Sequence, residues 1–208
     1  MSTKFLQGAP WHAMVELAEA DGSFDLIVMG THGRTGLKRL LIGSIAEKVV
    51  RHAPISVLVV RGNPDGPRFD HVLCPVDFAT DSPRVIERAE TFVGGSLDLL
   101  HVIELPLAAS GDPLLTDVIS DADHRATNRL EMYTAEIVAR HKLPVRSETL
   151  VGHPVAVILA KLEEDRTFDL VAIGTHGRSG LHRMLLGSTA EKLVRHAPCS
   201  VLVIRARA

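Results

Sequence analysis

The sequence lacks the features that mark membrane, secreted and nucleic-acid-binding proteins. None of its apolar runs reaches the roughly 20 residues that a helix needs to cross a bilayer, and Met1–Phe5 does not lead into the apolar core of a secretory signal. The formal net charge of -2 over 208 residues provides no basic excess for binding nucleic acid. We therefore expect a cytoplasmic protein whose partners include neither a membrane nor a nucleic acid.

Cysteine is also scarce. The chain has two cysteines, Cys74 and Cys199, and each lies in an apolar run typical of a strand. Such positions favour buried thiols over a disulfide, which suits a reducing compartment. We expect the two residues to be unpaired.

The sequence does contain a long internal repeat. Adding 144 to any position from Leu6 to Arg61 gives its counterpart between Leu150 and Arg205 without a gap, and more than half of the aligned positions are identical. Solenoid repeats have periods of ~20–50 residues, so a repeat of this length indicates a duplicated domain.

The two copies differ in length. Residues 1–62 hold only the back half of the repeat, residues 63–68 form a linker, and residues 69–208 hold a complete copy. The short copy lacks the strand that would lie beside the apolar run Phe24–Val28, which leaves part of its sheet uncovered. Two hypotheses stay open: the chain is truncated from a longer tandem protein, or the second domain or another chain covers the short copy.

The complete copy alternates predicted strands and helices. The expected strands are His71–Asp77, Ser96–Ile103, Pro144–Val151, Phe168–Ala172 and Ser200–Ile204. The expected helices are a segment around Val85–Val93 that Gly94-Gly95 ends, then Leu114–His141, Val155–Leu162 and one that opens at Gly187-Ser188. This order predicts an α/β fold with a mostly parallel sheet and helices on both faces.

A glycine-rich loop precedes the last helix of each copy. Gly174 ends a strand, Gly177 can adopt the positive φ of a tight turn, and Gly187-Ser188 opens a helix whose free N–H groups favour phosphate. The loop therefore predicts a phosphate site at the C-terminal end of a strand, where open α/β sheets bind ligands. Turn-forming glycines with an ordinary N-cap serine are the alternative interpretation. The first copy repeats the pattern with Gly30, Gly33, Gly43 and Ser44.

Together with Cys74-Pro75-Val76-Asp77 and Leu100-His101-Val102-Ile103, this glycine spacing closely resembles the ATP-binding class of the universal stress protein family. The resemblance covers the whole second copy, and the first copy is similar to the back half of another such domain. It implies an open, Rossmann-like α/β fold with five parallel strands in the order 3-2-1-4-5. It also implies dimerisation through the last strand, and ATP, ADP or AMP, with or without Mg²⁺, across the C-terminal edge of the sheet.

The resemblance implies a role for each matching residue. The backbone of Pro75, Val76 and Val102 would contact adenine, and Asp77 would face the ribose. The loop around the phosphates would be formed by Gly174, Thr175, His176, Gly177 and Arg178, and the phosphates would rest on Gly187, Ser188, Thr189 and Ala190. A partial second site would contain only the phosphate half, formed by Gly30, Gly33, Gly43 and Ser44.

The expected function is adenine-nucleotide binding by a regulator or sensor of a stress response, with no catalytic residue. Slow ATP hydrolysis or adenylyl transfer is the enzymatic alternative, although the S-G-G-x-D-S loop of adenylyl-transferring relatives is absent after the first strand. A dimerisation module that binds no nucleotide is the third alternative.

The expected partners are the nucleotide and either a second copy of the chain or an intrachain pseudo-dimer. In the pseudo-dimer, the last strand of the short copy, Ser56–Val60, would pair with Ser200–Ile204. The eleven histidines show no spacing typical of metal ligands, so we expect no metal site made by the protein alone.

Overall fold

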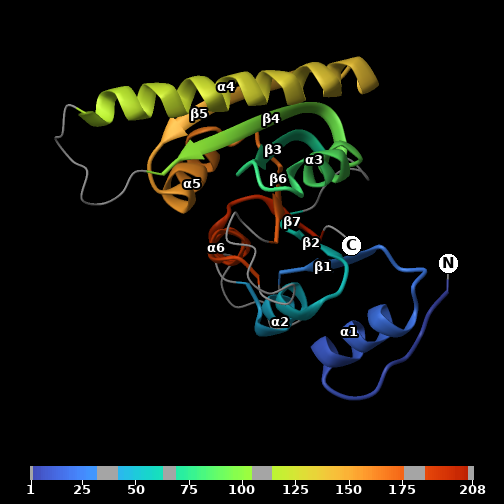
Figure 1. Cartoon of the computed structure of the whole chain (residues 1–208). Helices are drawn as coiled ribbons and strands as arrows, with labels where there is room; N and C mark the ends of the chain where they lie inside the picture. Colours follow the sequence, from blue (N-terminus) through green and yellow to red (C-terminus); the bar gives the residue numbers. More distant parts are fainter. Residues whose placement is uncertain (1, 32–41, 63–68, 105–113, 176–185, 206–208) are drawn as a thin grey trace.

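A single sheet runs through both copies of the repeat. The computed structural model describes residues 2–31, 42–62, 69–104, 114–175 and 186–205, and within these ranges seven strands follow the order β1-β2-β7-β6-β3-β4-β5 (Figure 1). The strands are β1 (Leu26–Gly30), β2 (Ser56–Val60), β3 (Phe69–Pro75), β4 (Val93–Ile103), β5 (Val145–Val151), β6 (Leu170–Gly174) and β7 (Ser200–Ile204).

The complete copy has the predicted α/β topology. Its strands β3 to β7 are parallel neighbours in the order β5-β4-β3-β6-β7, which corresponds to 3-2-1-4-5. The whole sheet differs from the predicted five-stranded one because β2 and β1 of the first copy extend it beyond β7.

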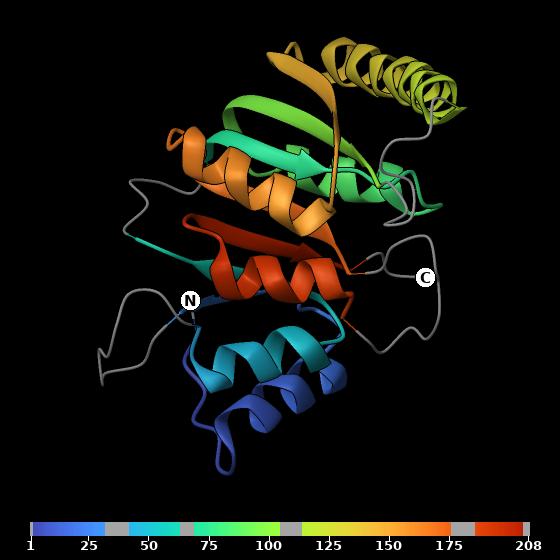
Figure 2. The same ribbon diagram turned by 90° about the vertical axis from the view of Figure 1, so that its left-hand side faces the viewer.

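Helices cover both faces of this sheet. They are α1 (Pro10–Ala20), α2 (Ser44–His52), α3 (Ser82–Glu90), α4 (Leu114–His141), α5 (Pro154–Glu164) and α6 (Ser188–His196). One face carries α1, α2, α6 and α5 in a row (Figure 2), and the other carries α3 and α4. Alternate strand residues point to the two faces, so Val171 and Ile173 pack under the first row whereas Leu170 and Ala172 pack under α3 and α4.

The two copies meet where their last strands pair. β2 and β7 are antiparallel, with Val57 opposite Val203, Leu58 opposite Leu202 and Val59 opposite Val201. Leu202 is fully buried and Leu58 is 6% exposed. The pairing considered for Ser56–Val60 and Ser200–Ile204 is therefore present within one chain, and it places the repeat copies about an approximate twofold axis.

We call the paired strands β2 and β7 the seam between the copies. Two arginines, one from each copy, stabilise this seam by binding the other copy. Nη2 of Arg61 donates to the carbonyls of Val194 and Arg195 at the end of α6, at 2.9 and 3.3 Å. Nη2 of Arg205, the repeat counterpart of Arg61, donates to the last carbonyls of α2 at 3.2 and 2.9 Å. Burial lowers the pKa of both guanidinium groups. Each copy thus caps the C-terminal end of the other copy's helix with a cation, where the helix dipole favours one.

Four charged side chains join α2 to α6 beside the seam. Arg195 pairs with Glu47 at 2.8 Å, and Arg51 pairs with Glu191 at 3.1 Å. All four are about one third exposed, so each pair contributes little stability.

The glycine pair Gly94-Gly95 corrects one prediction. The sequence suggested that these residues end a helix, but α3 ends at Glu90 and both glycines lie inside β4. A Cβ on Gly95 would lie 2.4 Å from the carbonyl oxygen of Asp70. Glycine is therefore required there by the close approach of β3 and β4, at the place where their register shifts.

Both cysteines are buried and unpaired, as predicted. Cys74 lies in β3 and Cys199 immediately precedes β7. Burial raises the pKa of each thiol from about 9.0 to about 12.

These thiols should make the stability of the protein fall at alkaline pH. The unfolded chain loses both thiol protons near pH 9, whereas the folded chain retains them until about pH 12. The free energy of unfolding is thus unaffected below pH 9 and should fall by roughly 1.4 kcal/mol per thiol at pH 10. Urea unfolding at pH 8 and pH 10 under reducing conditions measures this fall. A double variant, Cys74→Ala with Cys199→Ala, should show a smaller fall, and an unchanged fall would contradict the assignment.

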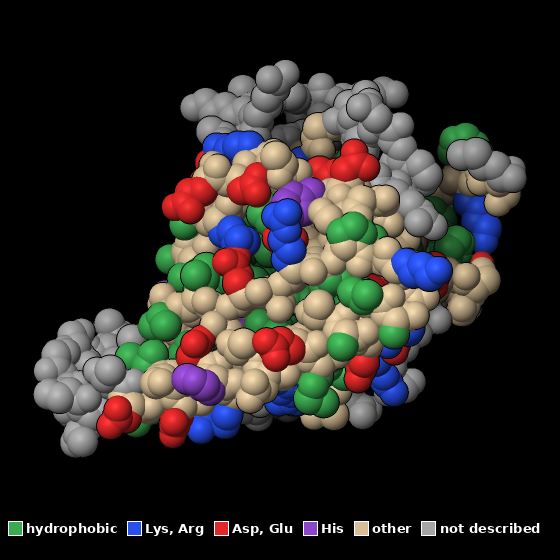
Figure 3. Space-filling view, turned by 90° about the horizontal axis from the view of Figure 1, so that it is seen from above, with side chains coloured by type: hydrophobic (Ala, Val, Ile, Leu, Met, Phe, Trp, Pro, Cys, Tyr) green, Lys and Arg blue, Asp and Glu red, His purple; other side chains and the backbone are tan. Residues whose placement is uncertain are grey.

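The face of the molecule that carries α4 is mixed in charge. Seen from above, on the side where α4 lies, acidic and basic side chains are interspersed with small apolar areas (Figure 3). Exposed apolar residues on α4 are Val118, Met132 and Val138. Within the described ranges, no helix combines the length and apolar character that a membrane crossing requires.

Candidate functional site

The candidate site lies at the C-terminal edge of the complete copy's sheet. β3 ends at Pro75, β4 ends at Ile103 and β6 ends at Gly174, and β3 is hydrogen-bonded between the other two. The chain leaves β3 in one direction to form β4 and returns on the other side to form β6. This reversal is the position where open α/β sheets form a ligand crevice.

On the β4 side, the segment that follows β3 is held by a buried histidine. The N–H of Val76 donates to the carbonyl of Leu100 at 2.8 Å, and Nδ1 of His101 lies 2.6 Å from the carbonyl oxygen of Val76. Because a carbonyl only accepts, Nδ1 carries the proton in this arrangement. His101 is 6% exposed. It therefore fixes the backbone that was predicted to contact adenine.

Asp77 anchors the turn between β3 and α3. Its Oδ1 accepts hydrogen bonds from the N–H of Ala79 at 3.0 Å and from Oγ of Ser82 at 3.2 Å. Ser82 is 4% exposed and begins α3. The buried hydroxyl of Ser82 therefore stabilises the turn by donating to Asp77.

Phe78 is a site residue that sequence reasoning missed. Its φ is +60°, an uncommon conformation for a bulky side chain. The ring lies 4.3 Å from the ring of His101, and the guanidinium of Arg129 lies 4.9 Å from its centroid. The strained backbone is thus held by contacts with β4 and α4. No motif in the sequence pointed to this cluster, because His101 and Arg129 lie far from Phe78 in the chain.

The phosphate half of the site joins the end of β6 to the start of α6. The N–H of Thr175 donates to the carbonyl of Ile204 at 3.1 Å, and the carbonyl of Thr175 accepts from the N–H of Gly187 at 2.7 Å. Gly187 is the N-cap of α6, and among the described residues no side chain caps this helix. The N-terminus of α6 therefore lies next to Thr175, the residue that follows β6.

The residues predicted to contact phosphate differ in how far their side chains are exposed to solvent. Ser188 is exposed as the first residue of α6 and Thr189 is half-buried, whereas the Ala190 side chain is buried. Ala190 therefore offers only its backbone. His176, Gly177 and Arg178 lie outside the described residues.

The first copy has the same arrangement at the start of its helix α2, but it lacks the strands that were predicted to contact adenine. Gly30 ends β1, the N–H of Gly43 donates to the carbonyl of Thr31 at 2.8 Å, and Ser44 begins α2. A Cβ on Gly43 would lie 3.0 Å from that carbonyl oxygen, so glycine is favoured there by space. Gly33 lies outside the described residues. No described strand takes the place of β3 beside β1, so this half-site has no described base side.

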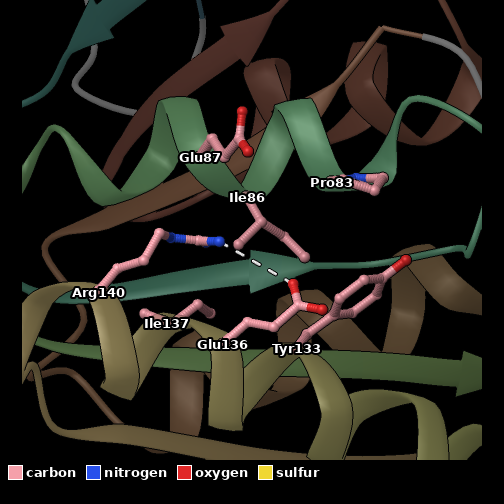
Figure 4. A pocket seen from close by; sticks show the side chains of 7 residues that line it. All are labelled: Pro83, Ile86, Glu87, Tyr133, Glu136, Ile137 and Arg140. Carbon is pink, nitrogen blue, oxygen red and sulfur yellow. Dashed lines mark ion pairs between the residues drawn. The ribbon is translucent and has the colours of Figure 1, made fainter.

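Two hollows in the described structure lie away from the candidate site. One lies between α3 and α4 and has room for about one water molecule; it is lined by Pro83, Ile86, Glu87, Tyr133, Glu136, Ile137 and Arg140 (Figure 4). The other has a volume of about 200 Å³ and lies between α3 and the seam, lined by Asp25, Ile55, Ser56, Arg84, Arg88, Ile204 and Arg205. Within the described ranges, no three His, Cys, Asp or Glu side chains are grouped as a metal site requires.

Comparison with known proteins gives consistent results for both copies. The family model described as the universal stress protein family matches residues 2–61 and, separately, residues 68–205. A universal stress protein of Synechocystis is 30% identical over 193 residues, which cover 91% of this chain and 61% of that protein. A universal stress protein of Methanocaldococcus jannaschii is 52% identical over 59 residues, or 28% of this chain and 34% of that protein.

Solved structures show the same fold. A universal stress protein from Archaeoglobus fulgidus is 28% identical with a TM-score of 0.66, and the match covers 93% of this chain and 66% of that one. A protein from Pseudomonas aeruginosa is 19% identical with a TM-score of 0.70, over 96% of this chain and 69% of that one. The chain spans about three fifths of the Synechocystis relative. Two family matches that together span nearly every residue place this chain in the universal stress protein family.

Proposed function

We propose that this chain binds an adenine nucleotide, foremost ATP, at one site in residues 69–208, and that it acts as a sensor or regulator in a stress response. The proposal rests on one observation, the closeness of three parts of the chain. The end of β3, the end of β4 and the N-terminus of α6 lie along one edge of the sheet, at the point where the strand order reverses.

The base would lie at the β3–β4 side of this edge. β4 runs past the last pair of the ladder, Pro75 with Leu100, so the backbone of Val102 extends beyond the end of β3. The carbonyl of Val76 already accepts a hydrogen bond from His101, and its N–H is bonded to Leu100. Polar recognition of the base is therefore assigned mainly to the backbone of Val102, with Pro75 and Val76 providing contact surface.

The sugar and phosphates would follow across the edge toward α6. Asp77 stands between the end of β3 and the start of α3, in a position suited to a ribose. The phosphates would rest on the N–H groups at the start of α6 and on the hydroxyl of Ser188, because a helix N-terminus favours anions. A Mg²⁺ ion, where present, would be held by the phosphates and water more than by protein carboxylates.

The pairing of β2 with β7 supports a second part of the proposal. It occupies the edge of the last strand, through which the family resemblance implies dimerisation. We infer that residues 1–62 and 69–208 act as two units, joined by residues 63–68, and form an intrachain pseudo-dimer in place of that homodimer.

Isothermal titration calorimetry with ATP, ADP and AMP tests the nucleotide site, and two matched glycine variants locate it. Gly187→Val would crowd the N-cap of α6 and remove binding, with at least a tenfold loss of affinity. Gly43→Val imposes the same side chain at the equivalent cap of α2 and should leave binding unchanged. Absence of heat with every nucleotide in the unaltered chain would contradict the proposal, and equal losses in both variants would contradict the assignment to residues 69–208.

A further inference from the structure

Charged side chains fill the contact between α2 of the first copy and α6 of the second, two helices that lie side by side (Figures 1 and 2). Oε1 of Glu191 lies 3.1 Å from Nη2 of Arg51 and 3.4 Å from Nη2 of Arg195. Oε1 of Glu47 lies 2.8 Å from Nη2 of Arg195 and 3.8 Å from Nη2 of Arg51. We call these four residues the interhelix charge cluster, and its two cations balance its two anions.

Glu191 lies at the end of α6 that is proposed to hold phosphate. Its N–H donates to the carbonyl of Gly187, the N-cap, at 3.0 Å, so Glu191 belongs to the first turn of the helix. The N–H groups proposed to hold phosphate belong to the residues just before it, Ser188–Ala190. A carboxylate in this turn interacts with the same positive helix end that a phosphate would use. Glu191 and a bound phosphate therefore repel each other.

A series of hydrogen bonds shows that Arg51 lies beside the same end of α6. The carbonyl of Arg51 accepts from Nη2 of Arg205 at 2.9 Å, and Arg205 directly follows Ile204 in the chain. The carbonyl of Ile204 accepts from the N–H of Thr175, and the carbonyl of Thr175 accepts from the N–H of Gly187. The last turn of α2 and the first turn of α6 are thus joined at one edge of the sheet.

We propose that Arg51 of the first copy is a specificity-determining residue of the nucleotide site in the second copy, where it neutralises Glu191 and so favours nucleotides with several phosphates. This inference rests on the nucleotide site proposed above. Arg51 acts through its charge and needs no contact with the ligand. Without Arg51, the interhelix charge cluster would retain one uncompensated negative charge beside a ligand whose own negative charge grows with each phosphate.

The size of this effect follows from distance and solvent screening. The four side chains are partly exposed, which is why their ion pairs contribute little to stability. A phosphate at the N-terminus of α6 would lie about one helical turn from Glu191, roughly 5–10 Å away. That separation does not exceed the Debye length of about 10 Å at 0.1 M salt, so one uncompensated charge should change the affinity for a polyphosphate roughly fivefold.

Calorimetric titration of the full chain with ATP, ADP and AMP tests this role. Arg51→Ala should weaken ATP binding roughly fivefold at 0.1 M salt, with a smaller loss for ADP and the smallest for AMP. The difference from the unaltered chain should disappear near 1 M salt, where the Debye length is about 3 Å. Arg166→Ala is the matched control, because it removes the same charge from an exposed ion pair with Glu163, before the start of β6. It should bind ATP as the unaltered chain does.

A double variant separates the effect of charge from an effect of packing. Arg51→Ala combined with Glu191→Gln removes both charges of the pair and should restore ATP affinity to within about twofold of the unaltered chain. A pair that only joined the helices would leave the double variant at least as weak as Arg51→Ala. Urea unfolding should give nearly equal stabilities for all variants, because exposed ion pairs contribute little.

Three outcomes would overturn the role of Arg51 and leave the nucleotide site itself intact. They are equal ATP affinity of Arg51→Ala and the unaltered chain at 0.1 M salt, equal losses for ATP and AMP, and no recovery in the double variant. Absence of heat with every nucleotide in the unaltered chain is a different result. It would refute the proposed function, and the role of Arg51 with it.

Discussion

Leu202→Asp is expected to destabilise the protein by more than about 4 kcal/mol, a large part of the roughly 5–15 kcal/mol by which native proteins are stable. Leu202 is fully buried in β7, pairs with Leu58 across the seam and packs in the apolar cluster beneath α3 and α4. A carboxylate there would lose its hydration without gaining a cationic partner in that apolar cluster. Urea unfolding monitored by circular dichroism measures the loss.

The matched control for this variant is Val151→Asp. Val151 also lies in a strand, but it is 46% exposed at the outer edge of the sheet in β5. An aspartate there remains hydrated, so a change of about 0.5 kcal/mol or less is expected. If Leu202→Asp lowered the free energy of unfolding as little as Val151→Asp does, the seam between the copies would contribute little to the fold.

His101→Ala is expected to cost roughly 3 kcal/mol of stability and to weaken nucleotide binding at least tenfold. The substitution removes the hydrogen bond to the Val76 carbonyl and leaves a cavity beside Phe78, two effects that add. Without His101, the strained backbone of Phe78 would relax and the base side of the site would lose its shape. Calorimetry with ATP and urea unfolding measure the two losses on the same variant.

An exposed histidine provides the control for this substitution. His124 lies on α4, and Nδ1 of its ring lies 2.7 Å from the carbonyl oxygen of Ser120. His124→Ala should change neither stability nor affinity measurably. If His101→Ala lowered stability while ATP affinity stayed unchanged, His101 would be a core residue without influence on the site.

The repeat and the bounds of several elements could be predicted because they rest on local sequence patterns, whereas the strand order was implied by the family resemblance. Ser56–Val60 and Ser200–Ile204 are continuous apolar runs, and both strands begin and end where predicted. The long helix Leu114–His141 also has the predicted bounds. These segments bury apolar residues at regular intervals, so sequence periodicity determines them.

Other features depended on contacts between distant residues and could not be predicted. Gly95 gives no sign in the sequence that Asp70 lies against it. Likewise, the φ of Phe78 is set by His101 and Arg129, which lie 23 and 51 positions away in the chain. Strands β1 and β6 begin two residues later than expected because Asp25 and Asp169 belong to the preceding turns.

The reciprocal arginine caps have a mechanical consequence. The N-terminus of α6 faces the proposed phosphate position, and Arg61 from the first copy holds the C-terminal carbonyls of the same nine-residue helix. The short copy therefore holds the end of α6 that lies away from the proposed phosphate position. A displacement of α6 would therefore act directly on Arg61, which follows β2, and through the ion pairs on α2.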